Sequence, residues 1–341
     1  MEGRAMVSLK QIAEKCGVSV ASVSKALNNH KDIGESTKER IRQTAAELGY
    51  YPNIAARTLK TNRSYNIGVL FADAANSGLT HDYFSAVLES FKTAAESRGY
   101  DITFLNTHTG SRSYLETCRQ RSIDGVVIAC IDFEQPEVIE LMNSSVPVIT
   151  IDYNYAACSS VVSENQKGMK ELTEYIISCG HQHIAYIHGD ENSSVTHARL
   201  EAFRSALSAH GIPVNEDLIL PSAYLDLASA AECTEKLLAL PMIPSCIIYP
   251  DDTALLGGLN VLHEHGLKIP QDISIAGYDG LRVSRYVSPK LTTIHQDTEQ
   301  IGFHAANQLI RQIEHVESAT PKHLIIQTNL IVGDSVSSRK I

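Results

Sequence analysis

Short apolar runs separated by helix-length segments recur through most of the chain, and this pattern restricts the possible folds more than any other feature. Each run is nearly continuous in apolar residues, as in a strand that is covered on both faces of its sheet. One intervening segment carries apolar residues at helical spacing and ends at Gly99. Strands that alternate with helices predict parallel sheets. The runs form two series, at 67–71, 102–106, 125–129 and 146–151 and then at 183–189, 245–249 and 272–278, which predict two similar α/β domains in tandem.

The first 50 residues follow a different pattern, because their apolar residues recur at helical spacing. Ser8 and Gln11 form a capping box, and Gly17 is placed to end the following helix in a left-handed conformation. Ser19 can cap a second helix after a tight turn. Two short helices joined in this way indicate a helix-turn-helix, although an ordinary helical hairpin gives the same local signals.

A third helix completes this N-terminal module. It is predicted to begin at a capping box of Ser36 and Glu39 and to end at Gly49. Through Tyr65 the chain has eleven Lys and Arg against six Asp and Glu, a net charge of +5, whereas the rest has 18 against 33, or −15, which together give −10. A basic head can replace the counterions of DNA phosphates, while an acidic body is repelled by DNA.

The second helix would present one polar face to solvent. Such a face suits the major groove of DNA. Lys25 can donate to the O6 and N7 atoms of guanine, and the small side chain of Ala21 can lie against a thymine methyl group. We predict that five residues of this face bind DNA: Val20, Ala21, Ser24, Lys25 and Asn28.

Residues 7–63 resemble the headpiece of the lactose-repressor and galactose-repressor (LacI/GalR) family of bacterial transcription regulators. The resemblance is carried by VSLKQIAEKCGVSVASVSKALNN, by STKERIRQTAAELGYYPN and by AARTLK. The family usually has arginine where Lys25 stands. Lysine lacks the planar fork that reads guanine with two hydrogen bonds, so the operator sequence is expected to differ while the mode of binding is kept.

The segment 51–64 reads as a linker that contains a short helix. A helical stretch of about eight residues is below the roughly 12 to 15 needed for persistence alone in water, so it should fold only against a partner. In the resembling family this hinge pairs with its copy in a dimer and inserts a leucine into the minor groove, which implies that role for Leu59. We include Asn53 and Arg57 of the same segment among the DNA-binding residues. A plain interdomain spacer is the alternative.

Polar residues follow the apolar runs of both series. Ligands bind beyond the carboxyl ends of the strands in open parallel sheets, so these residues point to one polar cleft between the two domains. Arg199 is a candidate hydrogen-bond donor there. Asp and Asn at the start of a loop also cap helices, and about half of these residues could have only that role. The residues that follow the runs are Asp73, Asn106, Asp152, Asp190, Asp251 and Asp279.

The core resembles the family's effector domain, which is itself similar to periplasmic sugar-binding proteins. The matching segments are GYDGLRVSRYVSPKLTTIHQD, PDDTALLG and the LEAFRSAL that follows Arg199. The resemblance implies two doubly wound parallel α/β subdomains. It also implies that Asp152, Arg199, Asp251 and Asp279 contact the effector, with Tyr83 or Phe84 stacking on it; Asp73 joins this predicted set. Asp251 replaces a frequent asparagine, and an ionised carboxylate can only accept, which favours a hydroxyl-rich or cationic ligand.

These observations divide the chain into three parts. Residues 1–50 form the headpiece, 51–64 the hinge, and 65–341 the effector-binding core. By the resemblance, the N-subdomain covers about 65–163 and 294–322, and the C-subdomain about 164–293 and 323–341. Three crossings between the subdomains make a hinge that lets them close around a ligand.

We therefore predict a homodimeric, ligand-responsive transcription regulator that binds a pseudo-palindromic operator, with repression as its default action. A sugar or sugar derivative is the expected effector. A purine corepressor and a phosphoprotein partner are alternatives within the family, and a glycoside-acting enzyme that uses the cleft carboxylates is the alternative of another class. No nucleophile elbow or P-loop is present, so no enzymatic activity is expected. The last strand is followed by no heptad pattern, so a dimer is expected rather than a tetramer.

The apolar runs, cysteines and histidines bear on cellular location, disulfide bonds and metal binding. No apolar run approaches the roughly 18 to 20 residues that span a bilayer, and the N-terminus has no apolar segment typical of a signal peptide, so a cytoplasmic location is expected. Seven cysteines without a C-x-x-C pair indicate neither disulfides nor zinc. The histidines of GHQHI and HEH have no spacing that completes a metal site, and we predict no cofactor.

Overall fold

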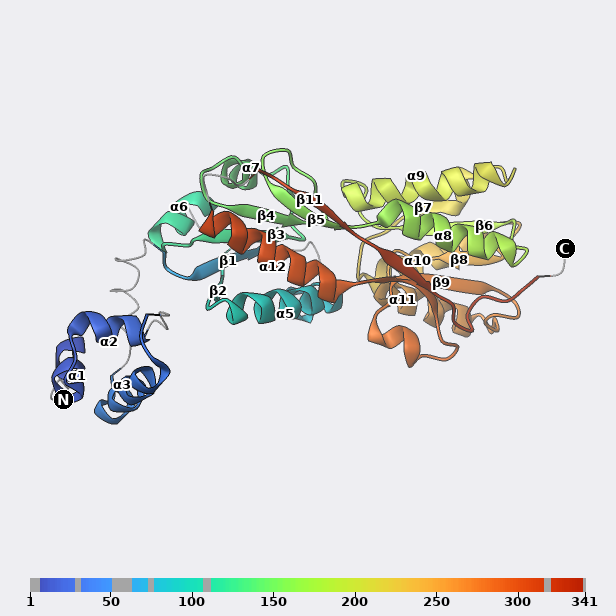
Figure 1. The fold of residues 1–341 in the computed structure, drawn as a ribbon. Coiled ribbons are helices and arrows are strands. Elements are labelled where there is room, and N and C mark those ends of the chain that lie inside the picture. The colour runs from blue at the N-terminus through green and yellow to red at the C-terminus, as the bar shows by residue number, and fades with distance from the viewer. Residues whose placement is uncertain are drawn as a thin grey trace, which may run out of the picture. The chain divides into compact units, whose positions relative to one another are not determined.

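The computed structural model describes residues 7–27, 32–50, 63–72, 77–106, 112–315 and 320–339. The chain divides into two compact units, Met1–Ser64, which includes the headpiece, and the core Tyr65–Ile341 (Figure 1). In the described residues no helix is long and apolar enough to cross a bilayer.

The headpiece is a bundle of three helices, α1 (Leu9–Cys16), α2 (Val20–Leu27) and α3 (Glu35–Leu48). Ile12, Val23 and Ile41 come from one helix each and have no exposed surface, so a single small core holds the three together. The capping box of Ser8 is formed as predicted.

The predicted start of the third helix is wrong by a few residues. Gly34 is the N-cap of α3, and no side chain caps it, so the expected capping box at Ser36 is not formed. Glu35 lies in the first turn, where a carboxylate favours the helix dipole, and it accepts a hydrogen bond from Lys38 Nζ at 2.7 Å. Ser36 therefore lies inside the helix.

The first sheet of the core has six parallel strands in the order β11-β5-β4-β3-β1-β2. Helices α5 and α12 cover one face, and α6 and α7 cover the other (Figure 1). The strands are β1 (Asn66–Phe71), β2 (Asp101–Phe104), β3 (Gly125–Ala129), β4 (Val148–Ile151), β5 (Ser159–Ser163) and β11 (His323–Ile326), and the helices are η1 (Gly78–Thr80), α5 (Asp82–Ser97), α6 (Tyr114–Gln120), α7 (Pro136–Met142) and α12 (Thr298–Glu314).

The second sheet repeats this plan with the order β12-β10-β9-β8-β6-β7, in which only β12 is antiparallel to its neighbour. Helices α8 and α9 cover one face, and α10 and α11 the other. The elements are α8 (Asn165–Ser178), β6 (Ile184–His188), α9 (Ser194–Ala209), η2 (Glu216–Leu218), β7 (Ile219–Pro221), α10 (Leu227–Leu238), β8 (Cys246–Ile248), α11 (Asp252–Glu264), β9 (Ser274–Asp279), η3 (Arg282–Arg285), β10 (Thr292–Gln296) and β12 (Thr328–Ile331).

The chain passes between the two sheets three times: after β5, after β10, and between β11 and β12. Two of the predicted subdomain boundaries differ from those in the structure. β10 stays in the second sheet to Gln296 instead of leaving it at 293, and β11 pairs with β5 of the first sheet, with His323 opposite Ser160. The segment 323–332 is therefore divided between the two sheets at Gln327.

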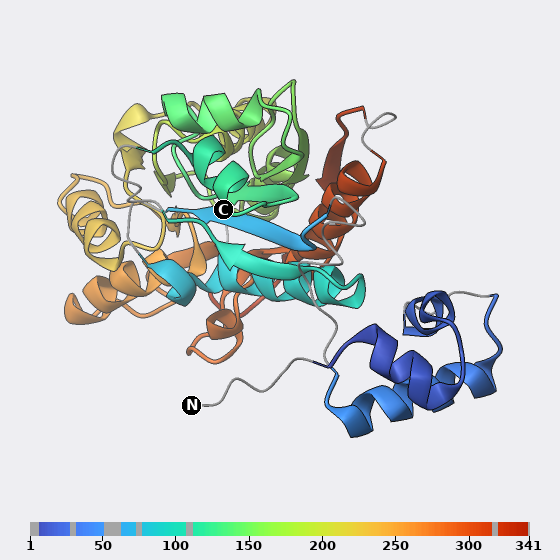
Figure 2. The same ribbon diagram turned by 90° about the vertical axis from the view of Figure 1, so that its left-hand side faces the viewer.

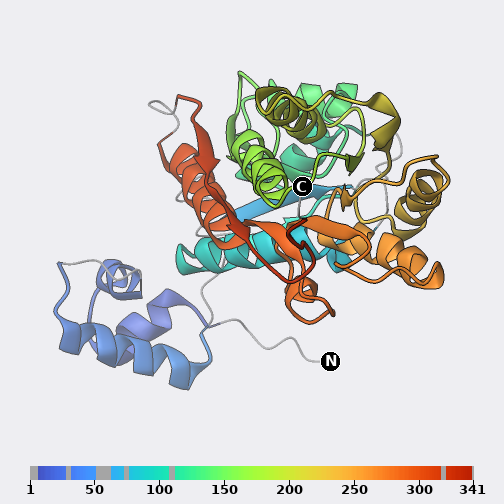
Figure 3. The same ribbon diagram turned by 90° about the vertical axis from the view of Figure 1, so that its right-hand side faces the viewer.

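Helices α5 and α12 are far apart in sequence but lie side by side in the views from either end (Figure 2, Figure 3). Ser90 Oγ on α5 donates to the Glu299 carbonyl of α12 at 2.6 Å. Gly302 makes this approach possible, because a Cβ there would lie 2.2 Å from the Val87 carbonyl oxygen. The helix that follows the second crossing is thus fixed against the first subdomain.

Candidate functional site

The strand ends of both sheets bring charged side chains to one place. Asp152 directly follows β4, Asp279 ends β9, and Arg199 lies on α9, which follows β6. Asp152 and Asp279 both have left-handed backbone conformations, with φ of 58° and 93°. Such conformations cost free energy for non-glycine residues and cluster at functional sites.

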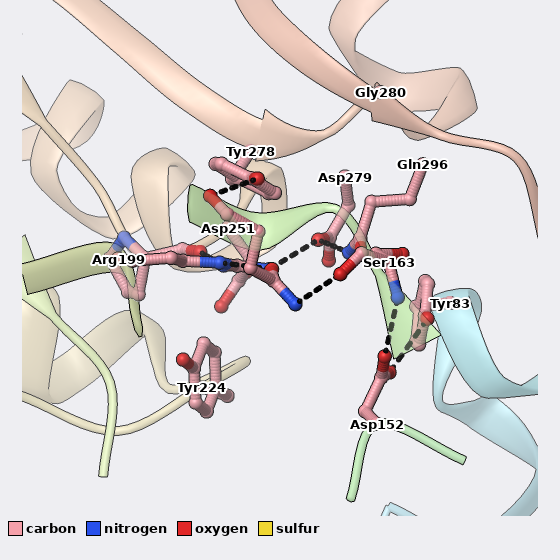
Figure 4. Close-up of polar contacts among 12 residues, drawn as sticks. Tyr83, Asp152, Ser163, Arg199, Tyr224, Asp251, Tyr278, Asp279, Gly280 and Gln296 are labelled. Atoms are coloured by element: carbon pink, nitrogen blue, oxygen red, sulfur yellow. Dashed lines mark hydrogen bonds and ion pairs between the residues drawn. The ribbon is translucent and has the colours of Figure 1, made fainter. Parts of the chain in front are cut away.

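Arg199 is the centre of this cluster, and only 2% of it is exposed. Its Nε donates to Asn165 Oδ1 at 2.8 Å, and its Nη1 donates to the Pro250 carbonyl at 3.0 Å. Its Cζ lies 3.5 Å from the centroid of the Tyr278 ring and 5.8 Å from that of Tyr224 (Figure 4). A guanidinium held by two hydrogen bonds and one ring face is positioned for recognition.

Asp279 faces Arg199 across a short gap. Its Oδ1 lies 3.9 Å from Arg199 Nη2 and accepts a hydrogen bond from Gln296 Nε2 at 2.6 Å. Burial raises the pKa of Asp279 to about 7, although the Arg199 cation opposes that rise. Its neighbour Asp252 is also buried, which raises the pKa of Asp252 well above its ordinary value.

The first subdomain contributes Asp152, which is half-buried. Tyr83 Oη donates to Asp152 Oδ2 at 2.8 Å, and the Ser163 amide donates to Oδ1 at 3.3 Å (Figure 4). Ser194 Oγ, at the start of α9, donates to the Asp152 carbonyl at 3.2 Å. This last hydrogen bond joins the two subdomains directly beside the cluster.

Three buried polar atoms around Arg199 and Asp152 have no hydrogen-bond partner among the described residues. They are Ser163 Oγ, Gln296 Oε1 and Tyr186 Oη. Their residues are at most 4% exposed. Buried polar groups nearly always bond to protein, water or a ligand, so these atoms mark hydrogen bonds that a bound molecule can complete.

The other predicted contacts have packing or capping surroundings. Asp251 caps α11, since its Oδ1 accepts from the Thr253 and Ala254 amides and its Oδ2 accepts from the Leu225 amide. Phe84 is 1% exposed, and its ring stacks on Phe71 with centroids 4.1 Å apart. The Asp251 carboxylate is therefore engaged by backbone amides, and the Phe84 ring is engaged in packing. Asp73 lies outside the described residues.

Four residues that contact Arg199 or Asp279 were not predicted from the sequence: Asn165, Tyr224, Tyr278 and Gln296. Tyr278 and Gln296 stand inside the GYD and IHQD segments, so the signal was present. Tyr224 has no local signal, because its place depends on distant partners. Thr196 Oγ1 lies 2.8 Å from its hydroxyl, and a Cβ on Gly189 would lie 2.3 Å from its ring.

In the headpiece, α2 has the two-sided character that the sequence predicted. Val23 and Ala26 are buried, whereas Val20, Ala21 and Lys25 are exposed and Ser24 is half-buried. Lys25 Nζ forms an ion pair with Asp32 Oδ2, and Ser19 Oγ accepts from the Ser22 amide at 3.0 Å. Four predicted DNA-binding residues lie outside the described part of the chain: Asn28, Asn53, Arg57 and Leu59.

A helix-turn-helix headpiece joined to a core that gathers polar side chains from two hinged sheets defines the class: a DNA-binding regulator whose core binds a small molecule. Across the described residues, no group of three or more His, Cys, Asp and Glu is placed to hold a metal ion.

Comparison with known proteins agrees with this class. Residues 8–53 match the model of bacterial regulatory proteins of the lacI family, and residues 173–336 match a periplasmic binding protein-like domain. The chain is 31% identical over 334 residues to the Probable HTH-type transcriptional repressor ExuR of Bacillus subtilis, covering 97% of this chain and 98% of that protein. It is 29% identical over 342 residues to the HTH-type transcriptional repressor PurR of Haemophilus influenzae, with 98% and 99% covered.

Solved structures agree in fold. The lac repressor dimer bound to operator and the anti-inducer ONPF is 23% identical, with a TM-score of 0.79 and coverage of 98% of this chain and 100% of that one. A LacI family regulator from Enterococcus faecium with bound ribose is 25% identical, with a TM-score of 0.71 and coverage of 81% and 100%. The chain belongs to the lacI family of bacterial regulatory proteins. It is a DNA-binding transcriptional repressor with an effector-binding core, and not an enzyme.

Proposed function

We propose that the side chains around Arg199 bind a small sugar-like effector, and that this binding changes the affinity of a homodimer for a pseudo-palindromic operator. The observation that carries the proposal is the position of Arg199. Its guanidinium is buried against Tyr278, and Asp279 of the second subdomain lies 3.9 Å from it, while Asp152 of the first subdomain is near enough to be affected by its charge. Small-molecule sites commonly combine apolar or aromatic walls with a few fixed polar groups.

The relatives support the same reading. A regulator of similar fold has been solved with ribose, and the lac repressor has been solved as a dimer on its operator. For this chain we assign the effector contacts to Asp152, Arg199 and Asp279, with Tyr83 and Asp251 holding the site from behind. Asp73 remains a proposed contact.

DNA binding falls to the headpiece and the hinge. Val20, Ala21, Ser24, Lys25 and Asn28 would read the major groove, and Leu59, with Asn53 and Arg57, would act in the minor groove. The exposure of Val20, Ala21 and Lys25 on one side of α2 supports the first of these roles. A protein that acts on operator DNA would work in the cytoplasm.

Effector binding would control DNA binding through the three chain crossings. A ligand shifts an equilibrium between two conformations only by its difference in affinity for them. A ligand that contacts both Asp152 and Asp279 would favour the closed arrangement of the subdomains. The change would reach the hinge segment 51–64, which directly precedes the first subdomain in the chain.

A thermal-shift screen of the full chain against monosaccharides, disaccharides and nucleobases tests the proposal. A ligand present at 100 times its dissociation constant stabilises the folded state by about 2.7 kcal/mol, which is easily measured. A sugar that raises the melting temperature and also changes operator affinity supports the proposal. A response to a purine alone, or only with a phosphorylated partner protein, would replace the sugar by the corresponding alternative.

A further inference from the structure

We propose that the effector is an uncharged polyhydroxyl compound, and that sugar acids and sugar phosphates are excluded. This inference rests on the proposed function, because it concerns the ligand of the same site. It depends on which atoms of Arg199 are still free to bind a ligand and on the charges that surround them.

Part of the Arg199 guanidinium is already occupied by the protein. A carboxylate or phosphate is bound most strongly when two parallel N–H groups of one guanidinium donate to two of its oxygens. Here Nε donates to Asn165 Oδ1 at 2.8 Å, and Nη1 donates to the Pro250 carbonyl at 3.0 Å. The Tyr278 ring covers one face of the guanidinium at 3.5 Å. The two hydrogen bonds use two of the five N–H groups of the guanidinium, and Asp279 lies 3.9 Å from Nη2, where a ligand would approach the remaining ones.

The charge around this end is negative. Four acidic groups interact here, Asp152, Asp251, Asp252 and Asp279, so a further negative charge among them would be unfavourable. Within the described core, Arg199 is the only buried Lys or Arg. An anionic ligand would therefore meet carboxylates without a second cation.

The atoms that lack partners favour hydroxyl groups. Gln296 Oε1 can only accept, and Ser163 Oγ can donate or accept. A hydroxyl matches these atoms and the carboxylates of Asp152 and Asp279, because it both donates and accepts. A cationic amino group would satisfy the acceptors but would lie beside the Arg199 guanidinium. An uncharged polyol satisfies all of these groups without adding a charge.

Matched sets of ligands test this inference on the full chain. Calorimetric titration compares D-galactose with D-galacturonate and D-galactosamine, D-glucose with D-glucuronate and D-glucosamine, and D-ribose with ribose 5-phosphate. We expect the neutral member of any set that binds to bind at least about 10-fold more tightly than its charged counterparts. Tighter binding of a uronate, a phosphate or an amino sugar overturns the inference but leaves a carbohydrate effector in place. Binding of nucleobases with no binding of any sugar overturns the inference and the proposed function together.

Two substitutions show whether the carboxylates cause the discrimination. Asp279→Asn and Asp152→Asn each remove a negative charge while keeping the shape of the side chain. Either should lower the ratio of neutral-sugar affinity to uronate affinity at least about threefold, since the added amide can donate to a carboxylate. Asp272→Asn is the matched control, because Asp272 is exposed, accepts from the Lys268 amide and precedes β9, whereas Asp279 ends that strand. A ratio that stays unchanged in both site variants would contradict the electrostatic cause.

Discussion

Arg199 Nη2 and Asp279 Oδ1 lie 3.9 Å apart, so the two groups attract each other without forming a hydrogen bond. One ligand hydroxyl at hydrogen-bond distance from both could accept from Arg199 and donate to Asp279. Charge-assisted hydrogen bonds of this kind are stronger than those between neutral groups. The pair is therefore open to a ligand, while Gln296 and Asn165 hold its two members in place.

The raised pKa of Asp279 predicts a pH dependence of stability. The folded-state pKa of about 7 lies above the unfolded value of roughly 3.9, so between these pH values the folded protein binds more protons than the unfolded chain. The free energy of unfolding should therefore decrease as the pH rises from 5 to 7 and change little above that. Asp279→Asn removes this dependence, and the slope of the difference between the two proteins should be at most about 1.4 kcal/mol per pH unit.

Urea unfolding at pH 5, 6, 7 and 8 measures this effect. Asp190→Asn serves as the control, because it removes an exposed carboxylate. Profiles of the wild type and Asp279→Asn that run parallel across the range would show that Asp279 ionises normally in the folded protein.

Lys25 is predicted to read a base, because it lies on the exposed side of α2 in a helix-turn-helix. Lys25→Ala should cost about 1 to 3 kcal/mol on the true operator and remove the preference at one base position. Lys15→Ala is the control, since Lys15 is exposed on α1 and pairs with Glu47 of α3 at 3.2 Å. Fluorescence anisotropy with operator variants and random DNA measures both. Equal losses on operator and random DNA would reduce Lys25 to a phosphate contact.

Leu281 is predicted to anchor the second subdomain to the first. It follows β9 of the second sheet, yet it packs into the hydrophobic cluster of the first subdomain, and its amide donates to Asp252 Oδ2 at 2.8 Å. Leu281→Ala should lower the free energy of unfolding by about 2 to 5 kcal/mol, as for other buried leucines. Tyr286→Ala, on the same loop and 84% exposed, should change it by about 0.5 kcal/mol or less. Chemical denaturation compares the two, and an equal effect would argue against the anchor.

Local signals predicted most of the framework. The apolar runs became strands, because continuous burial leaves a clear signal in the sequence. Gly17 and the capping box of Ser8 end and begin α1 as expected, since both depend on residues within one helical turn. The start of α3 was misjudged because Ser36 and Glu39 have the spacing of a capping box, but the N-cap is Gly34, two residues earlier. Spacing alone does not fix which residue leaves the helix.

Long-range pairing limited the prediction elsewhere. The segment 323–332 reads HLIIQTNLIV, and nothing in its sequence tells that its first half pairs with β5 in the other sheet. Asp251 follows a strand as Asp152 does, but only its three backbone donors reveal that it caps α11. Tyr224 was missed for the same reason, since its position depends on Gly189 and Thr196.

Substitution of Arg199 tests the proposed effector site most strongly. Arg199→Ala should abolish the effector's thermal shift and leave the headpiece folded, because the headpiece is a separate compact unit. Removing a buried charged group also destabilises the core, so Arg199→Lys is a second variant that keeps the charge but lacks the planar fork. It should weaken effector binding at least about 10-fold. Arg204→Ala is the control, since Arg204 lies on the same helix and pairs with Glu216 at the surface, 2.7 Å away.

The most direct test is the operator affinity of the wild type and of the Arg199 variants, measured by anisotropy over a titration of the sugar that stabilises the wild type. The account predicts that the sugar changes the operator affinity of the wild type and of Arg204→Ala, but has no effect on Arg199→Ala. If the sugar is an inducer, Arg199→Ala stays bound to the operator, and if it is a corepressor, the variant fails to bind. A variant that responds with the same half-maximal sugar concentration as the wild type would contradict the assignment of the effector site to Arg199.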